Sequence, residues 1–581
     1  MLIFILKEYL LLFLFTISLL GYGQLVRKKF FYYKNENNIV LKYLIQLGLG
    51  FSILILFVQI LLFLGFFNIK TVSILMLLGI LLTCYFYLSN IFNNKFVKLN
   101  CKIRNQFADN KLLFLFFIIT IFAIVLKPLR PPIAWDEVAY HLPHAKAWAS
   151  NGFLSINDNF RYPWFPYNFD ILYSIPILFN DDVFPKLIHG LLGFSVGLIG
   201  FVLLKNKSIV GILTISVWLL ISRGMFEKAY IEFALTFFIS FSFVLIYLWI
   251  TEDNRNYLYL ASLFFGVALG IKYQALFYIL PLILLTFTNY KKLNISLLIK
   301  CFILLIIPCL YWYLRNYLIT GNPINPIAGN FFGFYDWNSV DHDFQFNKLE
   351  SKRDIGDPVL LIFFLFIFFK VKYKNLSNLF YVVSISFIIW FWLSGYWRYL
   401  YPMFPLLCFF SSIVFIDFYE KVNLLIQNKG KIKLILKITL CLVLFIYFID
   451  SSFRFVRSSK YIPFDDVKRN EILQKKIRGY DAIKFINDNN LGPTYQFRME
   501  DSIYYFNGKV IGDTFGYGRY VDYFGLPASS LYNKLKAMSV KTLILGEWVD
   551  YDQKSFTRSN NFSDYFEMIY ESDGHEVYKL N

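Results

Sequence analysis

The chain has 581 residues, of which 57% are hydrophobic and only 17% are charged, whereas about a quarter of residues are charged in an average soluble domain. This composition excludes an ordinary soluble domain and indicates a membrane protein. The formal net charge of +18 would suggest a nucleic-acid partner in a soluble chain. Membrane proteins gather Lys and Arg in their cytoplasmic loops, however, which accounts for the charge without nucleic acid.

Apolar runs near the length that crosses a bilayer, roughly 20 residues, recur from the N-terminus to about residue 450. We count about 14 of them. Their centres lie near Phe13, Ile55, Ile80, Phe117, Phe194, Thr214, Phe241, Phe264, Leu282, Leu304, Phe364, Phe387, Leu407 and Leu444. The run at 257–288 is interrupted by Lys272 and is predicted to form two short helices that meet there. The sequence thus predicts an α-helical polytopic membrane protein with about 12–14 transmembrane helices.

Lys and Arg concentrate in alternate loops, at residues 27–42, 95–111, 205–207, 291–292, 370–374 and 421–433. The positive-inside rule assigns these loops to the cytoplasm. The opposite face then carries two long loops, 127–184 and 317–357, together with the tail after Asp450. We expect a multi-pass protein of the inner (cytoplasmic) membrane whose tail lies outside the cytoplasm.

The last 130 or so residues change character, because apolar runs shorten and charges of both signs mix. The predicted elements are helices at 480–489 and 529–538 and strands at 509–512, 541–545 and 575–580. We therefore predict three parts: N-terminal transmembrane helices at 1–110, a transmembrane core at 111–450, and a small extracytoplasmic α/β domain at 451–581.

The stretch PPIAWDEVAYHLPH at residues 131–144 places ionisable side chains between long apolar runs. Asp136 and Glu137 lie within about two to three helical turns of His141, His144 and Lys146. Ionisable residues are costly at the edge of a bilayer and usually face a cavity or a partner. The further ionisable residues predicted on this face are Glu227, Lys228, Glu232, Lys272, Arg315 and Arg398.

The mixture of charges in this set suggests a type of chemistry. Carboxylates can accept a proton from a hydroxyl, and Lys272, Arg315 and Arg398 can hold an anion such as phosphate. For any one residue, a structural ion pair or a side chain that reaches out to water is an equally good explanation. For the whole set on one face, we favour a functional site.

A metal site is one hypothesis for part of this set. His141 and His144 are three residues apart and could share a helical face with Glu137, which would suit a divalent metal. The same spacing also serves ordinary hydrogen bonds, so both alternatives stay open and no particular cofactor is predicted. The sequence has no P-loop, dinucleotide-binding glycine pattern or nucleophile elbow in a suitable context, so a nucleotide is not indicated as the direct substrate.

The motif WDEVAYHLPHAKAW at 135–148 resembles the acidic motif of the GT-C membrane glycosyltransferases, such as protein O-mannosyltransferases, the lipid A aminoarabinose transferase and the rhizobial lipopolysaccharide sugar transferases. KAYIE at 228–232 resembles the second acidic position of that family, and GIKY at 270–273 its helix-breaking Lys. RN at 315–316 followed by TGNP at 320–323, and RYLYP at 398–402, resemble two later basic motifs. The resemblance covers roughly residues 110–420.

This resemblance implies a transferase that moves a sugar from a polyprenyl-phosphate carrier to an acceptor hydroxyl outside the cytoplasm, with inversion at the anomeric carbon. Asp136 would be the general base, and Glu137 and Glu232 would orient hydroxyls. Lys272 and Arg398 would neutralise the departing phosphate, assisted by Arg315. His141 and His144 complete the set of substrate-binding candidates. The three additional spans before the motif and the α/β tail depart from the family pattern and leave the acceptor undetermined.

Two other functions fit a many-span protein with cationic groups. A flippase or exporter of lipid-linked saccharide would show paired broken helices in corresponding halves and charges near the bilayer midplane, whereas the sequence predicts one broken helix and charges at one face. An O-antigen ligase or polymerase would also use a lipid-linked saccharide but should lack the adjacent Asp136 and Glu137.

Overall fold

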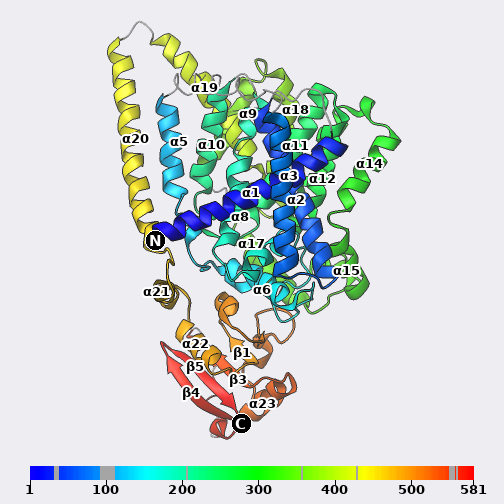
Figure 1. Cartoon of the computed structure of the whole chain (residues 1–581), viewed down its shortest axis with the longest axis vertical. Coiled ribbons are helices and arrows are strands. Elements are labelled where there is room, and N and C mark those ends of the chain that lie inside the picture. The colour runs from blue at the N-terminus through cyan, green and yellow to red at the C-terminus, as the bar shows by residue number, and fades with distance from the viewer. Residues whose placement is uncertain are drawn as a thin grey trace.

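The computed structural model describes residues 1–31, 38–91, 111–204, 207–354, 357–426, 430–547, 557 and 561–581. Parts of the basic loops at 27–42, 95–111, 205–207 and 421–433 lie outside these residues. Within the described part, nine helices are long and apolar enough to cross a membrane, or ten if one bent pair forms a single span. The predicted class, a helical multi-pass membrane protein with a small C-terminal α/β domain, is confirmed (Figure 1).

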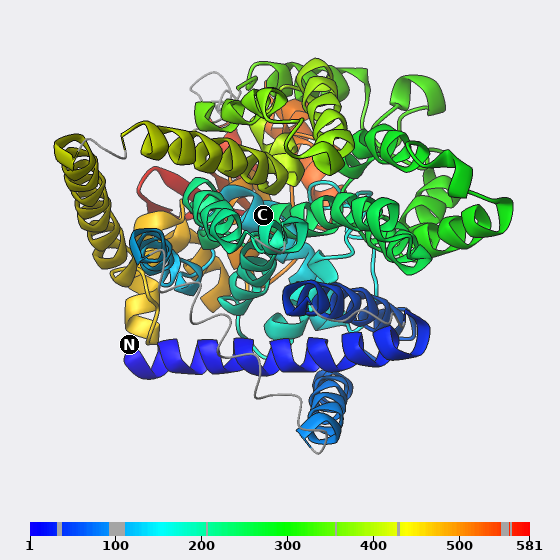
Figure 2. The same ribbon diagram turned by 90° about the horizontal axis from the view of Figure 1, so that it is seen from above.

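Three helices, α1 (Leu2–Phe30), α2 (Ile39–Phe63) and α3 (Ile69–Ile91), pack together at one side of the bundle. Glycines let them approach closely: a Cβ on Gly21 would lie 2.0 Å from the carbonyl oxygen of Gly79. Small residues are typical of such helix contacts in membranes. α1 is strongly inclined and lies at the periphery, as Figure 2 shows from above.

The centre of the bundle is α11 (Glu232–Glu252), whose most apolar 18-residue window is 94% buried. A helix that is apolar on all sides is expected in such a position. The other elements of this part of the bundle are α5 (Lys111–Ile124), α8 (Phe184–Val196), α9 (Ile199–Leu203), α10 (Ser208–Ser222), η3 (Met225–Glu227), α12 (Arg255–Leu269), α18 (Ser377–Leu393), η8 (Trp397–Met403) and α19 (Phe404–Leu425). Of these, α12, α8 and η8 pack most extensively against α11.

Broken helices explain why the long helices are fewer than the predicted apolar runs. The predicted break at Lys272 is confirmed, since α12 ends at Leu269 and is followed by η4 (Tyr273–Tyr278) and α13 (Ile279–Phe287). α14 (Ile295–Ile306) and α15 (Leu310–Thr320) meet at an angle of 69°. The run near Thr214 forms the short helix α10, and the run near Phe364 forms the 3-10 helix η6 (Pro358–Phe368).

One buried side chain satisfies backbone groups at two of these breaks. Asn168 donates hydrogen bonds to the carbonyl oxygens of Val267 (3.3 Å) and Pro308 (2.8 Å) and accepts one from the Trp312 indole (2.6 Å). Its backbone N–H also donates to the Gly270 oxygen at 2.8 Å. Irregular backbone is tolerated at membrane depth only where such partners exist.

The two regions predicted as long loops contain helices of their own. Region 127–184 holds η1 (Lys127–Leu129), the π-helix η2 (Glu137–His141), α6 (Leu142–Asn151) and α7 (Asp170–Leu178). Region 317–357 holds the end of α15, α16 (Gly329–Phe332) and α17 (Ser339–Glu350). Both lie at the end of the bundle from which the C-terminal domain projects, which we call the domain side (Figure 1).

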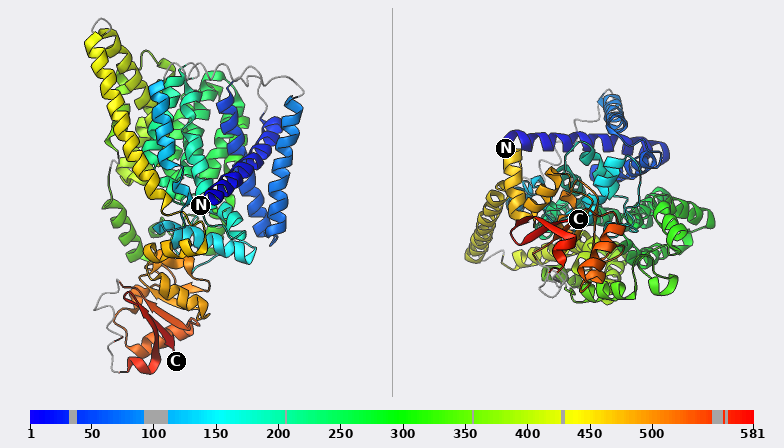
Figure 3. Two further views of the ribbon diagram at one scale, coloured as in Figure 1. Left: turned by 60° about the vertical axis from the view of Figure 1, so that its left-hand side comes forward. Right: turned by 90° about the horizontal axis from the view of Figure 1, so that it is seen from below.

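The chain leaves the bundle through α20 (Gly430–Ser459), a peripheral helix that packs beside α5 (Figures 2 and 3). The elements that follow are α21 (Asp466–Lys476), α22 (Tyr480–Asp488), β1 (Thr494–Phe497), η9 (Glu500–Tyr505), β2 (Val510–Ile511), η10 (Tyr520–Tyr523), α23 (Ala528–Ala537), β3 (Thr542–Leu545), α24 (Phe562–Tyr565), β4 (Phe566–Ser572) and β5 (His575–Leu580). The sheet order is β2-β1-β3-β5-β4. β1 is parallel to β2 and β3, and β5 is antiparallel to β3 and β4.

Candidate functional site

Four charged side chains from distant parts of the sequence meet on the domain side. The Arg398 guanidinium lies 2.8 Å from the Asp136 carboxylate and donates from Nε to Glu232 at 3.2 Å. Its Nη2 donates to the same Glu232 oxygen. Lys272 lies 3.7 Å from Glu232. We call these four residues, Asp136, Glu232, Lys272 and Arg398, the charged cluster.

Each member of the charged cluster lies at the end of a helix or in a break between helices. Asp136 immediately precedes η2, Lys272 lies in the gap between α12 and η4, and Arg398 lies in η8 before α19. Glu232 is the first residue of α11, where the partial positive charge of a helix N-terminus favours a carboxylate. The broken helices thus bring charges together without placing them in the middle of a span.

Asp136 and Arg398 are the members most accessible from outside. Their side chains are 16% and 15% exposed, against 1% for Glu232. The Tyr230 ring lies 4.8 Å from the Arg398 guanidinium, and its hydroxyl accepts a hydrogen bond from the Asp136 N–H at 3.4 Å. Burial opposes ionisation of Asp136, but the charges of Arg398, His141 and Lys272 together outweigh it and lower the pKa of the carboxyl. Asp136 is therefore an ionised carboxylate within reach of a ligand.

Glu137 lies in a different environment from its neighbour. Its carboxylate is 3.0 Å from the Lys186 ammonium, and both side chains are 0% exposed. It also accepts a hydrogen bond from the Ala229 N–H at 3.3 Å. Burial raises the pKa of Glu137, and Lys186 opposes that shift. Lys186 donates in addition to the carbonyl oxygens of Arg130 (2.8 Å) and Pro131 (2.6 Å), so the pair anchors the backbone just before Asp136.

The two histidines of the motif point to separate partners. His141 Nδ1 lies 2.5 Å from the Asp170 carboxylate, and His144 Nε2 donates to the Arg161 carbonyl oxygen at 3.1 Å. Burial lowers the pKa of His144 to about 3, so that its imidazole is neutral. In the described ranges, no three His, Cys, Asp or Glu side chains are arranged to hold a metal ion. His141, His144 and Glu137 do not converge.

Arg315 belongs to a second, aromatic group rather than to the charged cluster. Its Nε donates to the Asn316 side chain at 3.0 Å, and its guanidinium lies 5.0 Å from the Trp312 ring centroid. Asn316 in turn donates to the Trp164 carbonyl and to the Tyr273 hydroxyl, each at 2.7 Å. Tyr273 follows Lys272, so this group fixes the break in which Lys272 lies.

The other predicted residues of this face have structural contacts. The Lys146 ammonium donates to the carbonyl oxygens of Tyr504 (3.0 Å) and Phe506 (2.9 Å) in the C-terminal domain. Glu227 pairs with Lys127 at 3.2 Å, and Lys228 lies over the Tyr230 ring. These residues tie the domain side together and lie outside the charged cluster.

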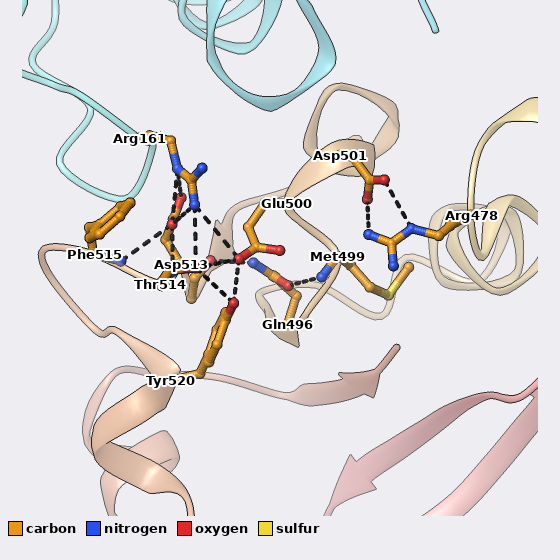
Figure 4. A network of polar contacts seen from close by, with 11 residues as sticks. Arg161, Arg478, Gln496, Met499, Glu500, Asp501, Asp513, Thr514, Phe515 and Tyr520 are labelled. Atoms are coloured by element: carbon orange, nitrogen blue, oxygen red, sulfur yellow. Dashed lines mark hydrogen bonds and ion pairs between the residues drawn. The ribbon is translucent and has the colours of Figure 1, made fainter. Parts of the chain in front are cut away.

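The C-terminal domain contacts Arg161, whose guanidinium packs on Trp135, the residue that precedes Asp136. Arg161 donates from Nε to both Asp513 oxygens, at 3.1 and 3.0 Å, and its guanidinium lies 4.6 Å from the Trp135 ring centroid and 5.1 Å from that of Phe515. Figure 4 shows Arg161 facing Asp513, with a second carboxylate, Glu500, beside it. The domain therefore holds Arg161, and Arg161 packs on Trp135 beside the start of η2.

Sequence reasoning missed Lys186, Asp170 and Asp513 as partners of the motif. A signal existed for Lys186, because an ionisable residue inside an apolar run such as FPKLIHGLL at 184–192 marks a partner or a site by default. Asp170 at the start of α7 and Asp513 in the tail carry no comparable local signal.

The fold and the site together define a multi-pass membrane protein with a charged cluster at one end of its helix bundle. A family model described as SF2091/S2213 matches residues 468–579, within the C-terminal part. The chain is 27% identical to the uncharacterized protein SF2092/S2214 of Shigella flexneri over 24% of this chain and 84% of that protein. It is 28% identical to the uncharacterized protein SF2093/S2215 of the same organism over 16% of this chain and 50% of that protein.

Among solved structures, the chain is similar to ArnT from Cupriavidus metallidurans in its apo state. The identity is 12% and the TM-score 0.49, with 81% of this chain and 98% of that chain covered.

Proposed function

We propose that the chain is a membrane glycosyltransferase of the GT-C type, which moves a sugar from a polyprenyl-phosphate carrier to a hydroxyl of an envelope lipid, glycan or protein. The observation that carries this proposal is that Arg398 contacts the accessible Asp136 carboxylate. The same guanidinium also contacts Glu232. The cluster offers a proton acceptor and two cations at one place, and the motif at 135–148 has the acidic pattern of that family.

In this reaction the acceptor oxygen attacks the anomeric carbon from the face opposite the phosphate. The bond between that carbon and the phosphate oxygen breaks, and its electron pair leaves with the polyprenyl phosphate. The acceptor proton passes to Asp136, and the configuration at the anomeric carbon inverts. Because a neutralised phosphate is a good leaving group, positioning and electrostatics can supply most of the acceleration.

Arg398 and Lys272 would receive the negative charge of the leaving phosphate. Without substrate, their two charges are balanced by Asp136 and Glu232. An incoming phosphate competes with Asp136 for Arg398, and a weaker ion pair raises the proton affinity of a carboxylate. Donor binding would thereby turn Asp136 into a stronger base when a proton must be accepted.

The two glutamates take supporting roles in this mechanism. We assign Glu232, which is 1% exposed, to hold Arg398 and Lys272 in place. We assign Glu137 to fix the start of η2 through Lys186, rather than to touch the acceptor. His141, His144 and Arg315 would shape the surroundings through Asp170, Arg161 and Asn316.

The proposed location is the inner membrane, with the domain side outside the cytoplasm. Lys207 and Lys372 converge on Asp417 near the end of α19, at 3.6 and 2.8 Å. α20 begins shortly after α19 and runs from that end of the bundle to the domain side (Figure 1). Basic residues at the end remote from the C-terminal domain agree with the positive-inside rule.

The test is the nearly isosteric variant Asp136→Asn in membranes supplied with a polyprenyl-phosphate sugar. We expect transfer to fall by about 100-fold or more, since a positioned base contributes on the order of 10²–10⁴. Asp158→Asn, on an exposed residue of the same outer region, is the matched control and should transfer normally. Undiminished transfer by Asp136→Asn would refute the base assignment. Movement of lipid-linked sugar across vesicles without transfer would favour a flippase.

A further inference from the structure

A cavity of about 360 Å³ lies on the domain side, where two membrane-crossing helices end. The span that contains α5 reaches it through Lys127 and Arg130, and α20 borders it with its last turns, from Asp450 to Ser458. Lys476 at the end of α21 closes it from the C-terminal domain. The lining residues place this cavity at the level where the apolar part of both helices stops, which is the level of lipid headgroups.

The lining of the cavity is strongly cationic. It contains two carboxylates, Glu227 and Asp450. Its five cations are Lys127, Arg130, Arg454, Arg457 and Lys476. Side chains of the charged cluster are not among them. The excess of three positive charges faces a volume large enough for a phosphate headgroup with several waters, given roughly 30 Å³ per water in the liquid.

Part of this positive charge has no carboxylate partner in the described part of the chain, although the Lys476 ammonium lies 5.1 Å from the Tyr461 ring centroid. Glu227 is occupied by Lys127 and Arg130, at 3.2 and 2.7 Å, and Asp450 by Arg454 at 2.7 Å. Arg457 and Lys476 have no carboxylate within ion-pair distance among the residues that the structure describes.

Arg130 has bonding capacity left as well. Its Nη1 binds Glu227 and its Nη2 donates to Ser458, but its buried Nε has no hydrogen-bond partner in the described part of the chain. Guanidinium and ammonium groups in such a position bind phosphate oxygens through charge-assisted hydrogen bonds.

The rim of the cavity is apolar on the side of α20. Phe453 lines the cavity and is 72% exposed, and the most apolar window of α20 is 0% buried within the protein. The outward surface of this helix therefore faces lipid. A ligand that fits both features has an anionic head for the cations and an apolar chain that lies along α20.

We propose that this cavity binds the phosphate headgroup of a membrane lipid. The site is separate in its residues from the charged cluster, and the inference stands without the transferase proposal. The same chemistry could come from free phosphate, but free phosphate would make no use of the apolar rim. Basic pockets between membrane helices are suited to anionic headgroups in this way.

The experiment uses the full chain, purified and placed in nanodiscs of phosphatidylcholine with or without phosphatidic acid, and in a third arm with inorganic phosphate added. Retained lipid is measured by native mass spectrometry, and stability by the temperature of unfolding. The test variants are Arg457→Gln and Lys476→Gln. Neither change removes the partner of a buried carboxylate, so the fold should be preserved. Lys475→Gln, on the exposed neighbour in α21, is the matched control.

We expect phosphatidic acid to be retained and to raise the unfolding temperature, while inorganic phosphate at the same concentration has little effect. Each test variant should bind phosphatidic acid about tenfold or more weakly, because hydrogen bonds to charged groups are worth roughly that factor, and the control should bind normally. Equal binding by the test variants would overturn the proposal, as would a response to inorganic phosphate alone. No sugar donor is present, so the outcome is independent of transferase activity.

Discussion

Arg161 in the outer region and Asp513 in the C-terminal domain, 352 residues apart, form a buried bidentate ion pair. The same guanidinium packs on the Trp135 ring, next to Asp136. The Arg161 side chain thereby links the position of the C-terminal domain to the charged cluster.

Asp513→Asn should therefore weaken both the domain contact and transfer. Removing one partner of a buried ion pair costs about 3–5 kcal/mol, and the loosened Arg161 no longer holds Trp135. Limited proteolysis of the C-terminal domain and the temperature of unfolding measure the first effect, and a transfer assay the second. Asp522→Asn, whose carboxylate is 51% exposed, should change neither. Full activity of Asp513→Asn would show that the domain contact does not position the site.

Replacing Arg398 should impair transfer in a graded way. Arg398→Gln leaves two carboxylates with Lys272 alone, and we expect a loss of about 100- to 1000-fold, the usual effect of removing a group that stabilises developing charge. Arg398→Lys keeps the charge but cannot reach Asp136 and Glu232 together, so it should recover only part of the activity. The transfer rate against pH is the measurement. The control is Arg353→Gln, at a side chain that is 40% exposed. Equal transfer rates for Arg398→Lys and the unmodified protein would contradict the role of Arg398 in contacting Asp136 and Glu232 together.

The pair of Glu137 and Lys186 should matter for stability more than for chemistry. Lys186→Met leaves Glu137 buried without its cation and should cost about 3–5 kcal/mol. The double variant Glu137→Gln with Lys186→Met removes both charges and should recover much of that loss. Thermal unfolding in detergent measures this, together with transfer at low temperature. If the single and double variants unfold at the same temperature, the loss in Lys186→Met does not come from an unpaired Glu137 charge.

Lys146 should give the contact with the C-terminal domain a pH dependence. Burial lowers the pKa of its ammonium to about 8 in the folded protein, against about 10.4 in an unfolded chain. Between these values the unfolded chain binds more protons than the folded one, so the stability should rise with pH from about 8 to about 10. Unfolding temperatures across this range test the prediction, and Lys146→Met should show a smaller rise. Parallel curves for the two proteins would exclude this assignment.

Much of the fold follows from local sequence. Apolar runs predicted the helical membrane class, and Lys272 within such a run predicted the break between α12 and α13. In the tail, the amphipathic stretch at 480–489 and the strand at 575–580 were predicted close to their observed bounds. β1 was missed because its four residues, Thr494–Phe497, include polar side chains although all are buried.

The site could be predicted only as a set of residue types on one face. The structure brings Asp136, Glu232, Lys272 and Arg398 together, while their roles remain proposals. Only the family resemblance separated Asp136 from Glu137, because adjacent carboxylates look alike in a sequence until Lys186 and burial distinguish them. The contact between Arg161 and Asp513 could not be predicted either, because a single sequence does not indicate which distant charges form pairs.

The spacing of the charged cluster along the chain has a consequence for biosynthesis. Chains are made from the N-terminus, so the ribosome adds both acidic members, Asp136 and Glu232, before either basic one. Glu232 must enter the membrane at the start of α11 before Lys272 exists, and Arg398 follows 166 residues after Glu232. Until then, these carboxylates must stay near water or carry a proton, because an unpaired charge in lipid is costly. The charged cluster is complete only once α19 begins to form. A nascent chain that stops earlier contains Asp136 and Glu232 but lacks Arg398.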